Sequence, residues 1–463
     1  MLGIALQREN DMTLARQIYQ ALKEHMMKGN LRLGEALPST RELAKLLTVS
    51  RNTVCEAYEM LSAEGFIESR QGSSTRVAEG LCLETNEPGI EDLGEVIKPP
   101  FPCLVDFRTG KPDLRRFPRQ SWMQAQRKAV EVMPLEQWGY TGPDGLDILR
   151  SEISAWLFRS RGITVNPKNL FITVGATQAL HILAELLSRK GQKIMVEDPC
   201  HTGMLRVLQG RGYDIHPLPV DEQGLQTDYL EGDGAYAMYV TPSHQFPLGG
   251  ILPAGRRTTL VQFARKHDQY IIEDDYDSEF RYTGVPVAPL YSMDPQRVIY
   301  VGTFSKILFP ALRIGYVILP PHLHAGWRDV RTHIDVQNPP FEQAALAAFL
   351  GSRKIDRYVR MMRKVYGQRR RILLGSLEKD LGRTWRSWGD AAGLHLAVQF
   401  SGMCFDHDFS VYARQHGVCV TPVEYHSIKK GLHLDKILLG YGHLEEAEIS
   451  SGVSLLKNLL EQI

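Results

Sequence analysis

A stretch rich in proline and acidic residues, at positions 81–104, divides this chain of 463 residues into two unequal parts. It holds four prolines, its acidic residues outnumber its single lysine, and its apolar residues follow no regular period. This composition is typical of a partly extended linker. We therefore expect a small unit over residues 1–80 and a large unit over residues 105–463, each with a core of its own.

Composition excludes several classes of protein. Hydrophobic residues make up 43% of the chain and charged residues 23%, which is typical of a globular protein and not of a disordered one. No apolar run approaches the roughly 18–20 residues of a membrane span, and no signal-peptide pattern begins the chain. The six cysteines are scattered without a CxxC pair. Their spacing argues against a zinc site or a disulfide framework and fits a reducing cytoplasm, so we expect no bound metal.

The small unit shows the pattern of three helices followed by two short strands. Apolar residues recur at helical spacing over residues 14–26. Ser39 and Ser50 are candidate N-caps of a second and a third helix, and Glu42 completes a capping box with Ser39. Strands are expected at residues 66–69 and 75–77. This order is the outline of a winged helix-turn-helix.

Residues at the helix starts and in the wing of this unit suit contact with DNA. Helix N-termini attract phosphate through their free N–H groups, and short polar side chains reach base edges. The candidate DNA-binding residues are Ser39, Arg41, Ser50, Arg51, Asn52, Thr53, Arg70, Ser73 and Thr75. The alternative is a small helical domain with a solvated charged face. Residues 1–80 hold ten basic and ten acidic residues, which is a weak electrostatic footprint for DNA binding.

From residue 105 onward, short apolar runs alternate with segments of helical length, as expected for βαβ units with a mostly parallel sheet. The apolar runs include residues 170–174, 193–196, 237–240, 270–272 and 298–301.

Three of these runs lead into residues of chemical interest. Lys306 follows one run in a loop with Thr303 and Ser305, and Arg313 comes seven residues later. Asp274 and Tyr276 follow a second run, and the small-residue turn that contains Ala176 and Thr177 follows a third. Each alone has an ordinary explanation: a surface lysine, a helix-cap cluster or a common strand-to-helix turn. Together they offer an imine-forming lysine, an acid for a pyridine nitrogen and a phosphate cup, as pyridoxal phosphate requires.

Longer strings identify families that this chain resembles. The segment LPSTRELAKLLTVSRNTVCEAYEMLSAEGFIESRQGSSTRV resembles the DNA-binding domain of the GntR family. Residues from about 105 to 460 resemble class I/II aminotransferases, which are pyridoxal-phosphate enzymes of fold-type I. The strings TPSHQFPLG at 241–249, IIEDDYDSEF at 271–280 and GTFSK at 302–306 resemble the MocR/GabR subfamily of regulators. The resemblance implies an α/β fold: a winged helix-turn-helix joined to a fold-type I domain with a smaller C-terminal α+β subdomain.

The resemblance also implies roles for single residues. Lys306 would form the internal aldimine with pyridoxal 5′-phosphate, Asp274 would bind the pyridine nitrogen, and Tyr276 would contact the ring oxygen. The implied phosphate-binding residues are Ala176, Thr177, Thr303, Ser305 and Arg313. Tyr140 would reach the phosphate of a partner subunit, which implies a homodimer. His201 stands where these regulators often have an aromatic residue, and its planar imidazole is expected to stack on the cofactor ring.

The chain departs from the aminotransferase pattern at two further points. Leu438 takes the position of an arginine that binds the substrate carboxylate, and Lys436 is a candidate replacement on the same strand face. Phe246 stands in place of an asparagine that contacts the ring oxygen, and His244 or Gln245 could substitute for it. A conventional amino-acid transaminase is therefore not the expected function.

The sequence thus predicts a cytoplasmic, pyridoxal-phosphate-dependent regulator of bacterial transcription that binds operator DNA and is not an enzyme. Its effector would be an amine, an amino acid or pyridoxal 5′-phosphate itself, and RNA polymerase would be a partner if the protein activates transcription. A slow half-transamination is compatible with this prediction. The alternative is a functional aminotransferase with an accessory DNA-binding head.

Overall fold

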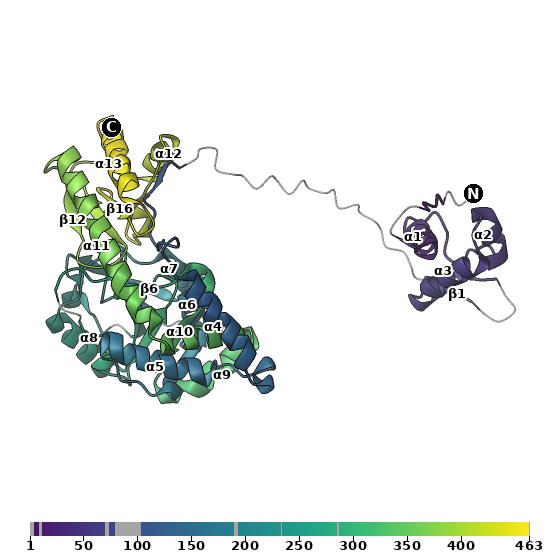
Figure 1. Ribbon diagram of the computed structural model, residues 1–463, viewed down its shortest axis with the longest axis horizontal. Coiled ribbons are helices and arrows are strands. Elements are labelled where there is room, and N and C mark those ends of the chain that lie inside the picture. The colour runs from purple at the N-terminus through teal and green to yellow at the C-terminus, as the bar shows by residue number, and fades with distance from the viewer. Residues whose placement is uncertain are drawn as a thin grey trace. The chain divides into compact units, whose positions relative to one another are not determined.

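The computed structural model describes residues 4–8, 12–69, 74–78, 103–188, 193–232, 234–284 and 287–462. These residues belong to two compact units, Met1–Lys98 and Pro99–Ile463 (Figure 1). Within the described ranges, every helix is too short or too polar to cross a membrane.

The first unit is the predicted winged helix-turn-helix. It consists of α1 (Leu14–Met27), α2 (Thr40–Leu47), α3 (Arg51–Ala63), β1 (Ile67–Glu68) and β2 (Arg76–Val77). Ser39 and Glu42 form the expected capping box at α2, and the Ser50 side chain accepts a hydrogen bond from the Thr53 N–H at α3. The two strands pair antiparallel. Apolar side chains from all three helices and the wing form one core, which includes Ile18, Leu22, Leu43, Val54, Leu61 and Val77.

The second unit is built on an eight-stranded sheet in the order β4-β11-β10-β9-β8-β5-β6-β7. The strands β5, β6, β8, β9 and β10 pair parallel, whereas β11 is antiparallel to both of its neighbours. The strands are β4 (Leu170–Thr173), β5 (Lys193–Asp198), β6 (Asp214–Asp221), β7 (Gly224–Leu225), β8 (Ala235–Val240), β9 (Tyr270–Asp275), β10 (Val298–Thr303) and β11 (Gly315–Ile318).

Helices cover this sheet and bury both of its faces. Met195, Met238 and Ile271 belong to one large core, whereas Val196, Tyr239 and Ile272 belong to a second core. Burial on both faces explains why the predicted strands are continuous apolar runs. The helices outside the C-terminal region are α4 (Arg119–Val132), α5 (Asp147–Arg161), α6 (Gly175–Leu186), α7 (Thr202–Gly210), α8 (Ala254–Lys266), α9 (His324–Ile334) and α10 (Pro340–Gly351).

The C-terminal region forms a smaller α+β subdomain, as the resemblance implied. Four antiparallel strands lie in the order β12-β13-β16-β15, and α11 packs along α13 (Figure 1). The short strand β14 pairs with β3, which begins the unit. The elements are β3 (Val105–Asp106), α11 (Lys354–Leu381), β12 (Arg386–Trp388), β13 (His395–Gln399), α12 (His407–Gln415), β14 (Val418–Cys419), β15 (Thr421–Pro422), β16 (Lys436–Gly440) and α13 (Glu446–Leu460).

One expectation from the sequence needs correction. The scattered cysteines argued against disulfides, yet the structure joins Cys103 to Cys419 across 316 residues of sequence. The pairing of β3 with β14 brings the two cysteines together, and no rule of sequence spacing describes such a contact.

A buried ion pair ties the start of this unit to α11. Arg369 and Asp113 are both at most 1% exposed, and the Arg369 guanidinium donates to the Asp113 carboxylate over 2.7 Å and to the Gly442 carbonyl over 2.6 Å. Burial alone would raise the pKa of Asp113, but the bond and the charge of Arg369, together with the bonds from Arg115, outweigh burial and lower it. The carboxylate therefore remains ionised at neutral pH.

We expect Arg369→Leu to lower the free energy of unfolding by about 3–5 kcal/mol, because the substitution leaves the Asp113 carboxylate buried without its main partner. Arg116 is the matched control, since its side chain is 48% exposed and lies 3.4 Å from the same carboxylate. Arg116→Ala should cost at most about 1 kcal/mol. Urea unfolding followed by circular dichroism measures both values, and equal losses would contradict this assignment.

Candidate functional site

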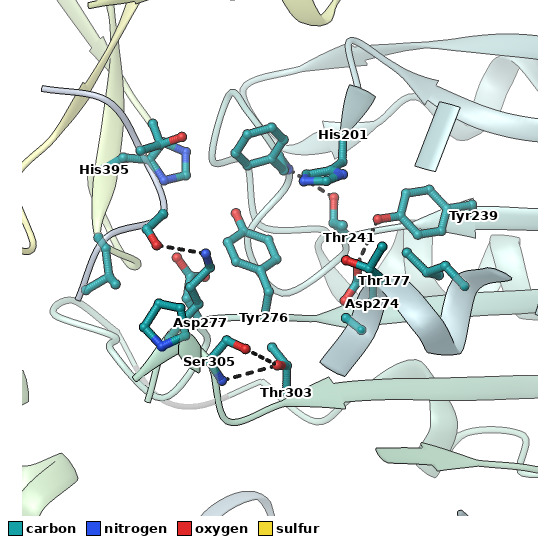
Figure 2. Close-up of a pocket in the computed structure, with 18 of the residues that line it drawn as sticks. Thr177, His201, Tyr239, Thr241, Asp274, Tyr276, Asp277, Thr303, Ser305 and His395 are labelled. Atoms are coloured by element: carbon teal, nitrogen blue, oxygen red, sulfur yellow. Dashed lines mark hydrogen bonds between the residues drawn. The ribbon is translucent and has the colours of Figure 1, made fainter. Parts of the chain in front are cut away.

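A cavity of about 280 Å³ lies at the carboxyl ends of the parallel strands, which is where open α/β sheets bind ligands (Figure 2). Every predicted cofactor-binding residue lines it except Tyr140. These lining residues are Ala176, Thr177, His201, Asp274, Tyr276, Thr303, Ser305, Lys306 and Arg313. Tyr140 is 88% exposed at the surface, and its predicted contact with a partner subunit stays a prediction.

Asp274 ends β9 with its carboxylate buried at the cavity. Tyr239 donates a hydrogen bond of 2.8 Å to Asp274 Oδ2, whereas Oδ1 has no partner within the described part of the chain. Burial, assisted by the nearby Asp277 carboxylate, raises the pKa of Asp274 to about 6. A buried acceptor without a donor is unfavourable. The Oδ1 atom therefore suits a ligand that brings a protonated ring nitrogen.

Lys306 lies in the loop after β10, and its ammonium group donates 2.8 Å to the carbonyl of Gly110. Burial lowers the pKa of Lys306, although the charges of Asp277 and Asp274 oppose this effect. Gly110 is needed here, because its φ is +82° and a Cβ would lie 2.9 Å from the Lys306 nitrogen. A lysine with a lowered pKa is a suitable nucleophile toward a carbonyl compound.

The opposite end of the cavity suits an anion. The helix α6 begins here after Val174, whose apolar side chain offers no cap, so the first-turn N–H groups remain available to a ligand. The Arg313 guanidinium donates 2.8 Å to the Val174 carbonyl. The hydroxyls of Thr303 and Ser305 lie 3.1 Å apart beside it. A guanidinium, two hydroxyls and a helix N-terminus are the groups that bind phosphate.

Tyr276 is positioned by His244, which lies outside the cavity lining and is in turn held by Asp277. Its hydroxyl donates 2.9 Å to the His244 carbonyl and lies 3.0 Å from His244 Nδ1. The same Nδ1 lies 2.9 Å from Asp277 Oδ1. Burial lowers the pKa of His244, but the charge and the hydrogen bond of Asp277, together with the Gly389 carbonyl, outweigh burial and raise the pKa overall. His244 thus acts on the position of Tyr276 and does not itself face the ligand.

A wall of aromatic and imidazole rings closes another side. Phe246 lies 5.5 Å from the His201 ring, 5.4 Å from the His395 ring and 4.9 Å from the His426 ring. Burial lowers the pKa of His395 to about 4 and that of His426 to about 3. Both imidazoles are therefore neutral at pH 7, and neither His395 nor His426 contributes a positive charge to this side of the cavity.

The position of the missing arginine is apolar. Leu438 on β16 is fully buried in a cluster with Leu248, Ala397 and Val423. Lys436 does not replace the arginine, because its ammonium group pairs with Asp435 over 2.6 Å and lies over the Trp388 ring. Lys436 is not among the residues that line the cavity.

Gln245 does not contact the ligand site either. Its amide nitrogen donates to the carbonyls of Pro199 and Phe246, and its oxygen accepts from the Leu248 N–H. Both ends of the side chain are therefore used in holding the local backbone.

Sequence reasoning missed several lining residues. Thr109 and Gly110 come from the segment after β3, which is distant in sequence from every predicted motif. Tyr239 and Thr241 lie at the carboxyl end of β8, and that position alone could have indicated them. Glu197 fixes Thr241 by accepting hydrogen bonds from its N–H and its hydroxyl.

The first unit carries the predicted DNA-binding residues on its helix starts and wing. Arg41, Arg51 and Asn52 are exposed. Ser50 and Thr53 hydroxyls lie 2.8 Å apart at the start of α3, where they cap the helix. Thr75 is half-buried before β2, whereas Arg70 and Ser73 lie outside the described residues.

Comparisons with known proteins cover both units. The family described as "Bacterial regulatory proteins, gntR family" matches residues 14–77, and "Aminotransferase class I and II" matches residues 104–433. The "Probable rhizopine catabolism regulatory protein MocR" of Rhizobium meliloti is 31% identical over 98% of this chain and 95% of its own. The "HTH-type pyridoxine biosynthesis transcriptional regulator PdxR" of Corynebacterium glutamicum is 33% identical over 98% of this chain and 99% of its own.

A solved structure matches the second unit. The archaeal alanine:glyoxylate aminotransferase superposes with a TM-score of 0.72 and 26% identity, over 77% of this chain and 91% of its own.

The lowered pKa of Lys306 predicts how this amine reacts. Ordinary lysines titrate near about 10.4, and burial shifts Lys306 below that value because it disfavours the charged form. In ligand-free protein, the pH midpoint of acylation should be lower for Lys306 than for the exposed Lys266, as measured by mass spectrometry of pulse-labelled peptides. Equal midpoints, or a higher one for Lys306, would show that burial does not govern this amine.

Proposed function

This chain belongs to the MocR/GabR subfamily of GntR-family transcriptional regulators, and we propose on that premise that the ligand around Lys306 controls operator binding by residues 1–80. The cofactor of the aminotransferase fold is pyridoxal 5′-phosphate, which supplies an aldehyde that condenses with amines. Residues 81–104 would link the DNA-binding domain to the cofactor-binding domain at residues 105–463.

The observation that carries this proposal is the unpartnered Oδ1 of Asp274 in the same cavity as Lys306. In our assignment, Asp274 binds the pyridine nitrogen and Lys306 supplies the amine that attaches the cofactor. Arg313, with the α6 N-terminus, holds the phosphate. Tyr276 is oriented toward the ring oxygen by His244 and Asp277.

A regulator of this kind needs two arrangements with different affinities for its ligand and for the operator. The bond between Lys306 and the Gly110 carbonyl offers such a coupling, because Gly110 belongs to the segment that begins the second unit. Any ligand that draws the Lys306 nitrogen away removes this bond. The segment that carries the linker then loses one of its contacts with the cofactor site.

The cavity favours an effector without a carboxylate. Its lining includes two positively charged side chains, Lys306 and Arg313, and both have roles toward the cofactor. Leu438, at the position where aminotransferases bind a carboxylate through an arginine, lies in an apolar cluster. We therefore favour pyridoxal 5′-phosphate itself as the effector, and a simple amine as second choice. The similarity to a pyridoxine biosynthesis regulator supports this choice.

A functional aminotransferase with an accessory DNA-binding head is the second candidate. Lys306, Asp274 and Tyr276 retain groups that a half-transamination needs, so a slow conversion is consistent with the site. Sustained turnover needs two carboxylate substrates in succession. The apolar surroundings of Leu438 weigh against it.

The proposal also includes partners. Leu135, Trp138 and Tyr140 are 79%, 52% and 88% exposed, and such a run of exposed apolar side chains suits a homodimer contact. Operator DNA is bound in the bacterial cytoplasm, and RNA polymerase would be a further partner of an activator.

Fluorescence anisotropy of a labelled operator fragment tests the proposed control. We expect pyridoxal 5′-phosphate alone to change the Kd of the full chain by at least about tenfold, which corresponds to a coupling of about 1.4 kcal/mol. Lys306→Ala should abolish this change, whereas Lys266→Ala should behave as wild type. If the cofactor leaves the Kd unchanged but an amine shifts it in the loaded protein, the amine is the effector. If neither changes the Kd, the proposal is wrong.

The charge balance of the head predicts a modest dependence of operator binding on salt. Residues 1–80 carry equal numbers of basic and acidic residues, so few phosphates are neutralised. Arg51→Ala should reduce the slope of log K against log salt by about 0.9, the contribution of one phosphate contact. Arg116→Ala, in the other unit, should leave the slope unchanged. An unchanged slope in the Arg51 variant would remove Arg51 from the interface.

A further inference from the structure

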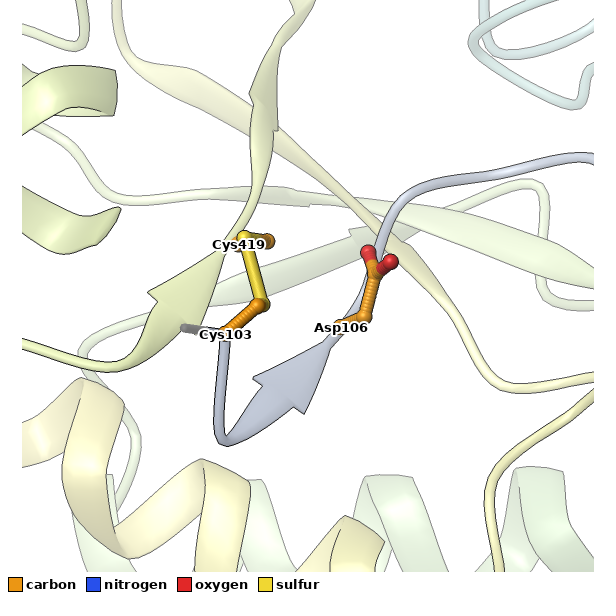
Figure 3. A group of neighbouring side chains, drawn as sticks. All are labelled: Cys103, Asp106 and Cys419. Carbon is orange, nitrogen blue, oxygen red and sulfur yellow. A yellow bond between two sulfur atoms is a disulfide. The ribbon is translucent and has the colours of Figure 1, made fainter. Parts of the chain in front are cut away.

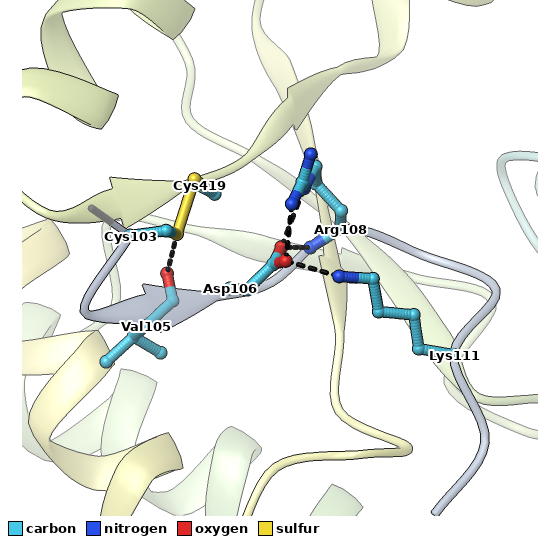
Figure 4. Close-up of a disulfide and its surroundings, with 6 residues drawn as sticks. All are labelled: Cys103, Val105, Asp106, Arg108, Lys111 and Cys419. Atoms are coloured by element: carbon cyan, nitrogen blue, oxygen red, sulfur yellow. Dashed lines mark hydrogen bonds and ion pairs between the residues drawn. A yellow bond between two sulfur atoms is a disulfide. The ribbon is translucent and has the colours of Figure 1, made fainter. Parts of the chain in front are cut away.

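We propose that Cys103 and Cys419 form a reversible thiol–disulfide pair through which this regulator responds to peroxides. The two residues are joined at the point where the second unit begins (Figures 3 and 4). Cys103 lies near the end of the stretch predicted as the linker, and Cys419 ends β14 in the C-terminal subdomain. The pair therefore acts on the part of the chain to which the DNA-binding head is attached.

The backbone brings the two cysteines together in either redox state. The Leu104 and Val105 N–H groups donate to the Gly417 carbonyl, and the Phe107 N–H donates 2.8 Å to the Cys419 carbonyl. The two Cα atoms are 6.0 Å apart, a common separation for disulfides. In the reduced state, the Cys103 thiol has the Val105 carbonyl as an acceptor 3.1 Å away. Neither state requires a different path of the chain.

Unequal access gives the two sulfurs different roles. Cys103 is half-buried, whereas Cys419 is only 4% exposed. The Cys103 thiolate therefore meets a peroxide first: it attacks the O–O bond, forms a sulfenic acid and releases an alcohol or water. The Cys419 thiolate then attacks this sulfur, the S–S bond forms, and the S–O oxygen leaves as water. Two electrons pass from the two sulfurs to the peroxide.

Reduction reverses the modification through the same exposed sulfur. A thiolate of a dithiol reductant attacks Cys103, and Cys419 leaves as a thiol. The second thiol of the reductant then releases Cys103, and the reductant becomes a disulfide. In a reducing compartment that contains operator DNA, a protein disulfide is usually transient and regulatory.

A metal site at the same place is less favourable. Asp106 lies close enough to the two sulfurs to share an ion with them (Figure 3). Its carboxylate already accepts hydrogen bonds from Arg108 and Lys111, however (Figure 4). Burial raises the pKa of Asp106, but these bonds together outweigh burial and lower the pKa. Two positive side chains repel a cation. Zinc in a structural site also takes four protein ligands, and this cluster has three.

The disulfide lies on the same segment as the contact with Lys306. From Cys103 the chain runs through β3, where Val105 and Phe107 are buried, to Gly110, whose carbonyl accepts the bond from Lys306. Oxidation fixes this segment at Cys103, and the cofactor site acts on it at Gly110. The effect on operator binding rests on the proposed function, whereas the redox chemistry does not.

The first experiment measures the chemistry in the full chain. After incubation with hydrogen peroxide, non-reducing peptide mapping should join Cys103 to Cys419, and a dithiol reductant should recover both thiols. Cys103→Ser and Cys419→Ser should each prevent the cross-link, and Cys404→Ser should not, since Cys404 is an exposed thiol outside the pair. A pair that stays reduced under peroxide, or that a dithiol cannot reduce in folded protein, would overturn the proposal. Zinc binding that both single variants abolish would also overturn it.

The second experiment measures the consequence. Hydrogen exchange of the Leu104, Val105 and Phe107 amides should be at least about tenfold slower in the oxidised protein. The operator Kd of the two forms should differ at least threefold, and the difference should disappear in Cys103→Ser. Cys55→Ser, which removes a thiol from α3, should respond as wild type. If the cross-link forms but alters neither the amide exchange nor the operator Kd, the disulfide has no regulatory role.

Both redox forms are measured with and without pyridoxal 5′-phosphate, which separates this proposal from the proposed function. If oxidation changes the operator Kd but the cofactor does not, the redox proposal stands and the proposed cofactor control is wrong. If the cofactor changes the Kd of wild type and oxidation does not, the cofactor control stands and the regulatory role of the disulfide is wrong.

Discussion

The candidate site depends on the burial of opposite charges at one edge of a parallel sheet. The strands β8, β9 and β10 end together, so Tyr239, Asp274 and Lys306 meet in one cavity. Burial raises the pKa of Asp274 and lowers that of Lys306, which moves the two groups toward neutrality. A cationic ring would favour the ionised form of Asp274, and an electrophile would react with the lone pair of the neutral Lys306 amine. The site is thus organised for a ligand that carries both.

Much of this arrangement was predictable from the sequence. The apolar runs at residues 270–272 and 298–301 became β9 and β10, and the polar residues after each run line the cavity. The capping box of Ser39 and Glu42 likewise formed as the local pattern indicates. In each case, the signal and the structure lie within a few residues of each other.

Contacts between distant parts of the chain were not predictable. Gly110 meets Lys306 across 196 residues, and Asp277 orients His244 from another loop. Lys436 has the right spacing to replace the missing arginine, yet a neighbouring aspartate and an indole ring hold it elsewhere. The sequence of a strand predicts the face on which a side chain lies, but it does not predict which partner that side chain contacts.

The cluster around Leu438 makes the loss of the arginine difficult to reverse. The neighbours Leu248, Ala397 and Val423 are fully buried and apolar, so they offer neither space nor counter-charge to a guanidinium. A single back-substitution would place an unpaired charge in the core, at a cost of several kcal/mol. Several neighbours would have to change before an arginine became tolerable again. The packing of this small cluster therefore makes the absence of an arginine robust to single mutations, because any one-residue route to an arginine passes through a destabilised protein.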